Sequence, residues 1–171
     1  MPCVPAPPTP PQPSPESPAS RTRAPGAAGW PAAPAALGPA TDAERARELP
    51  AGLTSAAALH CLPNAHGSAV MLVHSATAPK AVLRTLPALP RTQWVESVHA
   101  AWAASAAVTA AYRPATPAPA DSLPAAPESA DRHGDEHVIK LADTCLEVHR
   151  RTGRPEALAA VVRAAGLIDE L

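Results

Sequence analysis

The sequence predicts an all-α fold, a helical bundle or helical array fragment, behind a disordered N-terminal tail that is rich in Pro and Ala. Three observations support this prediction. In the central and C-terminal parts, apolar residues recur every three or four positions, which is the period of an amphipathic helix. Pro and Gly stand where helices would begin or end. Hydrophobic residues make up 46% of the 171 positions but aromatic ones only 2%, so we expect small side chains and a thin core.

The chain is expected to divide into four segments. Residues 1–40 hold 13 of the 24 Pro and few side chains that could form a core, so we expect an extended, unfolded tail. A helical segment is expected over 41–113, followed by a Pro/Ala-rich linker over 114–130. The C-terminal part, 131–171, is predicted to form an αα-hairpin.

Proline residues are expected to break the first half of the helical segment into short pieces. Thr41 and Glu44 fit a capping box, and the helix that they open would end at Leu49 because Pro50 follows. A second short helix is expected over 54–62.

Two further helices are expected before the linker. The apolar run 69–73 is predicted to be a buried helix, after which Thr77 and Pro79 indicate the cap and first turn of a new helix. The strongest helix is predicted over 92–112. Its expected inward face consists of Val95, Val98, Trp102, Ser105, Thr109 and Tyr112.

The hairpin is predicted from its caps. One helix is expected over 135–151, with Gly153 as a left-handed C-terminal cap, and Pro155 opens the next helix, which Gly166 would end in the same way. The first helix is expected to turn Val138, Leu141, Ala142, Cys145, Leu146 and His149 inward. The second is expected to turn Leu158, Val161, Val162 and Ala165 inward.

Charge and motifs exclude several classes of function. The net charge is −1 and no basic block occurs, which argues against nucleic acid or an anionic membrane as the main partner. The three Cys are isolated, and neither a dinucleotide-binding glycine motif nor a P-loop is present. No metal or flavin motif is seen. Because no apolar run is long enough for a signal peptide or a membrane span, a cytoplasmic protein is expected.

Two stretches carry a resemblance to a known family. The first begins as MLVHSATAPKAV at 71–82, continues through LPALP at 86–90 and a tryptophan-containing helix, and ends at 106–114. The second is HGDEHVIKL at 133–141. In this order the pieces resemble the questin oxidase-like family, over about residues 50–171.

The resemblance implies an all-helical oxidoreductase. Such proteins oxidise aromatic polyketides, including anthraquinones, by a Baeyer–Villiger-type oxygen insertion and ring opening, with NADPH as the reductant. A small aromatic or quinone-like substrate is therefore expected. Family proteins also carry an N-terminal helical portion with its own histidine motifs, where this chain has a proline-rich segment. We therefore expect uncovered helix faces that promote self-association, and no NADPH oxidation by this chain alone. The alternative is a non-catalytic helical remnant or a protein-interaction module.

The resemblance singles out His74 as a proton donor or acceptor at a reacting carbonyl. A histidine bonded to a main-chain carbonyl is the structural alternative. His137 and Lys140 are candidates for contacting a quinone oxygen or a cofactor phosphate. Their structural alternative is a helix start, since Asp135 and Glu136 suit the positive end of a helix and Glu136 can pair with Lys140.

Residues 133–137 also spell H-x-x-E-H, the inverted zinc-protease string. Gly134 stands where that motif needs a continuous helix, so no metal site is predicted.

Overall fold

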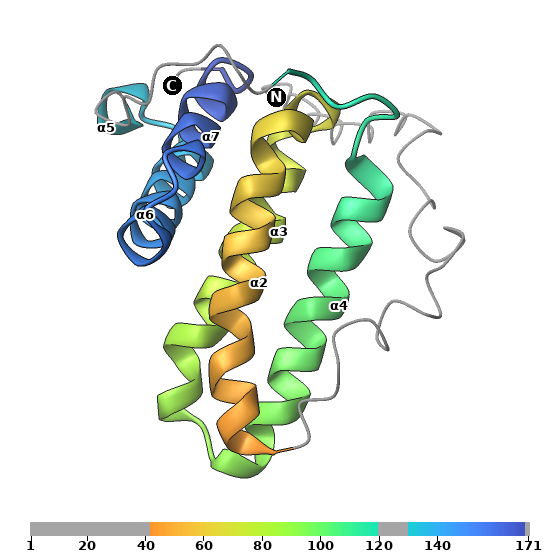
Figure 1. The fold of residues 1–171 in the computed structure, drawn as a ribbon, viewed down its shortest axis with the longest axis vertical. Helices are drawn as coiled ribbons and strands as arrows, with labels where there is room; N and C mark the ends of the chain where they lie inside the picture. Colours follow the sequence, from red (N-terminus) through yellow and green to blue (C-terminus); the bar gives the residue numbers. More distant parts are fainter. Residues whose placement is uncertain (1–41, 120–129, 170–171) are drawn as a thin grey trace, which may run out of the picture.

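The computed structural model describes residues 42–119 and 130–169, and all regular structure in these ranges is helical (Figure 1). The all-α prediction is therefore confirmed. The expected tail over 1–40 and the linker residues 120–129 lie outside the described residues. The expected cap at Thr41 is wrong, because Asp42 caps α2. The helices are α2 (Ala43–Asn64), α3 (Ala69–Thr85), α4 (Trp94–Tyr112), α5 (Ala130–His133), α6 (Glu136–Thr152) and α7 (Glu156–Ala165). Short 3-10 turns occur at Ala65–Gly67, Leu86–Ala88 and Arg91–Gln93.

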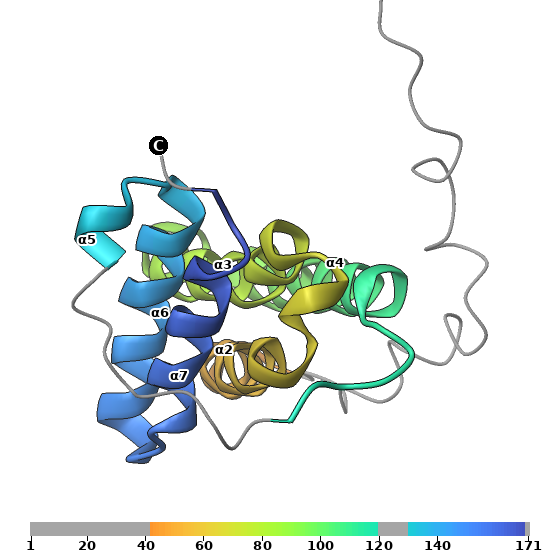
Figure 2. The same cartoon turned by 90° about the horizontal axis from the view of Figure 1, so that it is seen from above.

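Three long helices, α2, α3 and α4, stand side by side, and the α6–α7 pair packs against α2 and α3 (Figures 1 and 2). The larger hydrophobic cluster joins α2, α3, α6 and α7. Its fully buried members include Leu72, Val73, Val138, Leu141, Val148 and Val161. A smaller cluster joins the starts of α2 and α4 with the turn after α3, and consists of Ala46, Leu86, Trp94 and Val98.

The expected helix break at Pro50 is wrong, because α2 runs without interruption through this residue. Asp42 caps the helix by accepting a hydrogen bond from the Arg45 backbone N–H at 2.9 Å. Pro50 is fully buried, and its carbonyl accepts a hydrogen bond from the Thr54 hydroxyl at 2.7 Å. A proline inside a helix removes one hydrogen bond. Packing of α2 against α3, α4, α6 and α7 offsets that loss.

The expected helix start at Thr77 is also wrong. Residues 69–85 form one helix, α3, with Pro79 buried inside it. The Thr77 hydroxyl donates to the Val73 carbonyl at 3.1 Å, within the helix, instead of capping a new one. As in α2, contacts with neighbouring helices decide the outcome rather than the local preference of proline.

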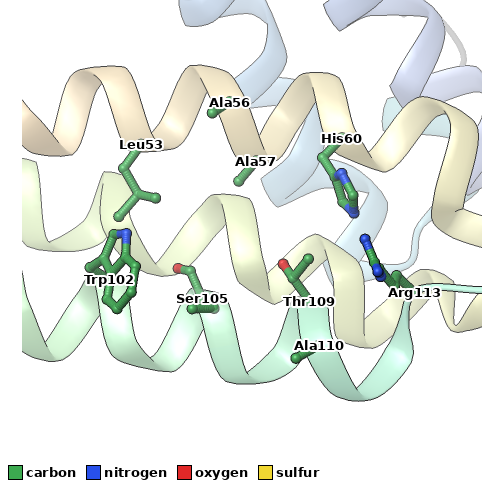
Figure 3. A pocket seen from close by; sticks show the side chains of 10 residues that line it. Leu53, Ala56, Ala57, His60, Trp102, Ser105, Thr109, Ala110 and Arg113 are labelled. Atoms are coloured by element: carbon green, nitrogen blue, oxygen red, sulfur yellow. The ribbon is translucent and has the colours of Figure 1, made fainter. Parts of the chain in front are cut away.

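The inward face of α4 is rotated from the predicted one. Trp94, not Trp102, is the buried tryptophan, and its indole N–H donates to the Leu89 carbonyl at 3.0 Å. Trp102 is half-buried and lines a pocket between α2 and α4, opposite Leu53 (Figure 3). Most other positions of α4 are Ala. The apolar pattern therefore predicts a helix, but it does not determine which side of that helix faces the core. The buried stripe is Trp94, Val98, Ala101 and Ser105.

The two hairpin helices form where the sequence predicts them. Asp135 caps α6, and Gly153 ends it in the left-handed conformation with φ 72°. Gly166 is different from the prediction, because its φ is −76° and its conformation is right-handed. The buried face of α7 also turns toward alanines rather than Leu158 and Val162, since small side chains let the helix approach closely. It consists of Ala157, Ala159, Ala160, Val161 and Ala164.

Candidate functional site

The facing sides of α3 and α6 line an open pocket of about 410 Å³. Residues spaced three or four positions apart lie on one face of a helix, so each helix presents a row of polar groups to the other. Two of the three predicted site residues, His74 and Lys140, line this pocket. The lining residues are His74, Thr77, Ala78, Lys80, Ala81 and Arg84 from α3, and Lys140, Asp143 and Thr144 from α6.

The third predicted residue, His137, lies directly against His74. The two imidazole rings meet edge to face, with 5.1 Å between their centroids and 90° between their planes. His137 Nδ1 lies 3.2 Å from Asp135 Oδ1, and an ionised carboxylate can only accept, so the proton is on Nδ1. In the neutral form of the ring, the other nitrogen, Nε2, is an acceptor.

Asp135 has two roles, and the sequence analysis considered only one of them. The same oxygen, Oδ1, accepts the backbone N–H groups of His137 and Val138 at 2.8 and 3.3 Å, which caps α6. Burial acts to raise the pKa of Asp135, but these hydrogen bonds hold it below its ordinary value. Sequence reasoning treated Asp135 as a helix start alone. The signal for its second role is the spacing, since a capping carboxylate two positions before a histidine can reach that imidazole.

His74 is poised to accept a proton. Its pKa is lowered by burial first, and then by the neighbouring His137 and Lys140, against a smaller opposing effect of Glu136. Each of these shifts has a physical cause, because burial and nearby positive charge both disfavour an imidazolium. His74 is therefore neutral at neutral pH. Lys140 forms the predicted ion pair with Glu136, and this hydrogen bond lowers the pKa of Glu136.

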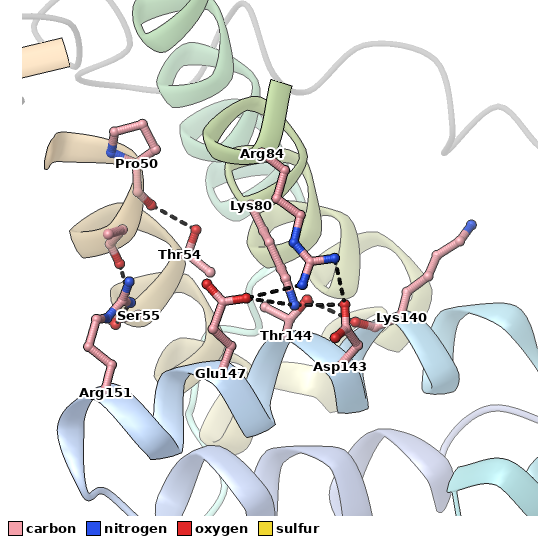
Figure 4. A network of polar contacts seen from close by, with 11 residues as sticks. Pro50, Thr54, Ser55, Lys80, Arg84, Lys140, Asp143, Thr144, Glu147 and Arg151 are labelled. Atoms are coloured by element: carbon pink, nitrogen blue, oxygen red, sulfur yellow. Dashed lines mark hydrogen bonds and ion pairs between the residues drawn. The ribbon is translucent and has the colours of Figure 1, made fainter. Parts of the chain in front are cut away.

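A buried lysine, which the sequence analysis did not single out, lies at the centre of the pocket's charges (Figure 4). Lys80 is 4% exposed, and its Nζ lies 2.7 Å from Asp143 Oδ2 and 3.2 Å from Glu147 Oε2. Arg84 reaches the same two carboxylates at 3.4 and 3.3 Å. The hydrogen bond from Lys80 is the main reason why the pKa of Asp143 lies below its ordinary value. This network fixes α3 against α6.

The H-x-x-E-H string does not form one helix face. His133 ends α5, and Gly134, with φ 78°, separates it from α6. The His133 Nε2 lies 3.1 Å from the Ala165 carbonyl and 3.0 Å from the Ile168 carbonyl, so His133 holds the end of α7. Across residues 42–119 and 130–169, no group of three or more His, Cys, Asp or Glu is placed to hold a metal ion.

The α3–α6 pocket does not fit NADPH well. A dinucleotide needs donors for its phosphates, either a glycine-rich turn before a helix or cations that are free to bind. In the α3–α6 pocket, Lys80 and Arg84 are already paired with Asp143 and Glu147, and Lys140 with Glu136. These contacts leave no cation of the pocket without a carboxylate partner.

Within the described ranges, no helix has the length and apolar character that crossing a membrane requires. Comparisons of the chain with protein-family models, with curated proteins and with solved structures found no match.

Proposed function

We propose that this protein is a cytoplasmic oxidoreductase of the questin oxidase-like type, which binds a small aromatic or quinone-like substrate in the α3–α6 pocket. The reaction would be a Baeyer–Villiger-type oxygenation with ring opening, in which molecular oxygen would supply the inserted oxygen atom. NADPH would supply the electrons that reduce the second oxygen atom to water. The observation that carries the proposal is the convergence of three residues chosen from the sequence. His74 and His137 come from segments 63 positions apart, and they meet at the pocket that Lys140 also lines.

The proposed role of His74 is to accept a proton from a phenolic hydroxyl of the substrate. A neutral imidazole is a suitable base near pH 7. Loss of the proton makes the aromatic ring richer in electrons and therefore easier to oxidise. Lys140 would stabilise the phenolate charge electrostatically.

In this proposal, Asp135 and His137 position the base. Asp135 holds the His137 ring through Nδ1, and His137 in turn packs against His74. A carboxylate behind an imidazole fixes the orientation of the ring and its tautomer. NADPH would supply the reducing equivalents. It enters the proposal through the family resemblance, and we assign it to no described residue.

The test uses the visible spectrum of a hydroxyanthraquinone, because its phenolate absorbs at longer wavelength than its phenol. We expect the full chain to bind this compound and to shift it toward the phenolate band at neutral pH. The His74→Gln variant should lose the shift. The matched control is His99→Gln, because His99 is an exposed histidine on α4 that lines neither pocket.

Turnover is the second measurement. Oxidation of NADPH with the hydroxyanthraquinone should appear when a family N-terminal half is supplied in trans, and His74→Gln or His137→Gln should then lower it by about 100-fold or more. If both variants turn over normally, or if His74→Gln keeps the phenolate shift, these histidines have structural roles only.

The alternative is a non-catalytic helical protein or an interaction module. The observation in its favour is that every cation in the pocket is paired with a carboxylate, as in a structural network. Among the described residues, Ile139 and Leu167 are large apolar side chains with 45% and 46% of their surface exposed. If Ile139 and Leu167 belong to a surface through which the protein self-associates, Ile139→Ser should lower the molar mass measured by light scattering.

A further inference from the structure

A second pocket, of about 440 Å³, lies between α2 and α4. It involves a different pair of helices from the His74 pocket, and none of the predicted site residues lines it. Small side chains make the space, since Ala57 on α2 and Ala106 and Ala110 on α4 stand where larger residues would fill it. Trp102 and Arg113 are eleven positions apart, which corresponds to about 16 Å along a helix, so the pocket is elongated.

The two ends of the pocket differ in chemistry (Figure 3). Leu53 and Trp102 face each other at one end and form an apolar wall. His60 and Arg113 lie together at the other end, with Thr109 beside them. A ligand that fits both ends must therefore be apolar along most of its length and polar at one end.

Two hydrogen-bonding groups in this pocket have no partner among the described residues. Ser105 is 4% exposed, and its hydroxyl lines the pocket without a hydrogen bond. The Nε2 of His60 is likewise buried without one. Buried polar groups in proteins are nearly always hydrogen-bonded, so unpaired groups that line a pocket indicate a missing acceptor or donor.

The tautomer of His60 shows what kind of partner is missing. The Asn64 Nδ2 lies 2.9 Å from the His60 backbone carbonyl, which identifies it as the amide nitrogen. The same Nδ2 lies 3.3 Å from His60 Nδ1, so Nδ1 accepts and the proton is on Nε2. His60 therefore offers a donor at this end of the pocket.

Arg113 adds a second donor and a positive charge at the same end. Its charge and burial both lower the pKa of His60, with burial the larger cause, so the imidazole is neutral. No ion pair of Arg113 is formed within residues 42–119 and 130–169. Two donors thus lie side by side at this end, the buried Nε2 of His60 and the exposed, charged guanidinium of Arg113. A carboxylate satisfies both, because its two oxygens accept only.

We propose that this pocket binds an elongated apolar molecule that carries one carboxylate, such as a medium-chain fatty acid or an arylalkanoic acid. The carboxylate lies between Arg113 and His60, the apolar body extends along α4 to Leu53 and Trp102, and the Ser105 hydroxyl contributes where the ligand carries a polar atom. This site is independent of the proposed oxidoreductase function.

The experiment is calorimetric titration of the full chain with decanoate and with phenylbutyrate, which separate a flexible chain from an aromatic body. Decanol and acetate are the controls for the charge and for the apolar body. We expect decanoate or phenylbutyrate to bind one-to-one with a dissociation constant below about 1 mM. Decanol and acetate should bind at least about tenfold more weakly than that carboxylate. The indole signal of Trp102 should shift in the nuclear magnetic resonance spectrum.

Three variants locate the ligand. Arg113→Gln should weaken binding about tenfold or more, because a charge-assisted hydrogen bond is lost. Ala106→Leu should block binding by filling the pocket. Arg47→Gln, which removes an exposed arginine of α2 outside the pocket, should change nothing. Circular dichroism confirms that each variant is folded.

The proposal is overturned if neither carboxylate binds to the wild-type chain, or if decanol binds as tightly as decanoate. It is also overturned if folded Arg113→Gln and Ala106→Leu proteins bind as the wild type does. These results leave the His74 proposal unaffected, because that proposal is tested with a different ligand and different variants.

Discussion

The imidazole rings of His74 on α3 and His137 on α6 contact each other. This is one of three contacts between the two helices in which the paired residues are the same number of positions apart in the sequence. Lys80 and Asp143 are separated by 63 positions, as are the two histidines and as are Arg84 and Glu147. A constant offset along two helices means that they run parallel and in a fixed register. The α3–α6 pocket is therefore built by two helices that present their residues in matching order.

The histidine pair predicts a measurable titration. We expect His74 to titrate below the ordinary histidine pKa of about 6.5, because burial and then His137 and Lys140 disfavour its charged form. The unfolded chain then binds a proton at a pH where the folded chain does not. The folded state is therefore not penalised by His74 above about pH 6.5, and it loses stability as the pH falls from there through the lower pKa of the folded protein.

Histidine signals followed by nuclear magnetic resonance against pH provide the measurement. His137→Gln should raise the pKa of His74 only in part, since burial is the larger cause. A His74 midpoint at or above the ordinary histidine pKa of about 6.5 would contradict the arrangement of the two rings.

Because Lys80 is buried, removing its carboxylate partners should cost more free energy of unfolding than removing the lysine charge itself. Replacing both carboxylates, as Asp143→Asn with Glu147→Gln, leaves Lys80 buried and without a full charge partner, and should lower the free energy of unfolding by about 3–5 kcal/mol. Lys80→Met keeps the apolar stem and should cost much less.

Chemical denaturation of the three proteins decides this prediction. The control is Glu48→Gln, which breaks the exposed pair of Arg45 and Glu48 and should cost less than about 1 kcal/mol. Equal losses from Lys80→Met and from the double carboxylate variant would show that Lys80 contributes through its charge on α3 and not through the cost of burying it unpaired.

Two glycines form a matched pair with opposite expectations. A Cβ on Gly67 would clash with the Tyr112 carbonyl oxygen and lie 2.9 Å from Pro114 Cδ, so the backbone would have to move. We expect Gly67→Ala to destabilise the protein by about 1–3 kcal/mol, as overpacking does. Gly52 lies exposed inside α2 with nothing within 4 Å of a built Cβ, so Gly52→Ala should stabilise by about 0.5–1 kcal/mol.

Thermal unfolding of both variants provides the comparison. A Gly67→Ala protein as stable as the wild type would mean that the turn after α2 does not approach the end of α4 as closely as the structure describes. A destabilised Gly52→Ala protein would contradict the continuous α2 helix through this position.

The sequence predicts helix ends correctly where they depend only on neighbouring residues. Asp135 begins α6 and the left-handed Gly153 ends it, close to the expected bounds of 135–151, because a cap depends on residues within one turn. The predictions at Pro50 and Pro79 are wrong for the opposite reason. The missing N–H of a proline is a local loss, whereas the packing that compensates for it comes from helices far away in the sequence.

The candidate site could be predicted in part. The resemblance named His74, His137 and Lys140, and the structure brings them together. Lys80 could not be selected from the sequence, because its partner Asp143 is identified only when the register of α3 against α6 is known. The second role of Asp135 becomes apparent only when the His137 ring is seen next to its carboxylate. The α2–α4 pocket was not predicted at all, since it consists largely of alanines and of groups that lack partners.

The two tryptophans of α4 are expected to differ in how much stability the protein loses when each is replaced by alanine. Trp94 is 7% exposed, packs in the cluster with Leu86 and Val98, and donates a hydrogen bond to the Leu89 carbonyl. Truncating a buried tryptophan typically costs about 3–5 kcal/mol, so Trp94→Ala should unfold much of so thin a core. Trp102 is half-buried in a pocket wall, belongs to neither hydrophobic cluster, and leaves no closed cavity when it is removed.

We therefore expect Trp102→Ala to keep a cooperative unfolding transition and to lose clearly less stability than Trp94→Ala, because open pockets are already in contact with water. Denaturant titrations followed by circular dichroism compare the two variants without relying on tryptophan fluorescence. If Trp102→Ala is the more damaging change, then Trp102 faces the core, and the rotation of α4 that forms the α2–α4 pocket is wrong. The carboxylate site proposed there would fall with it.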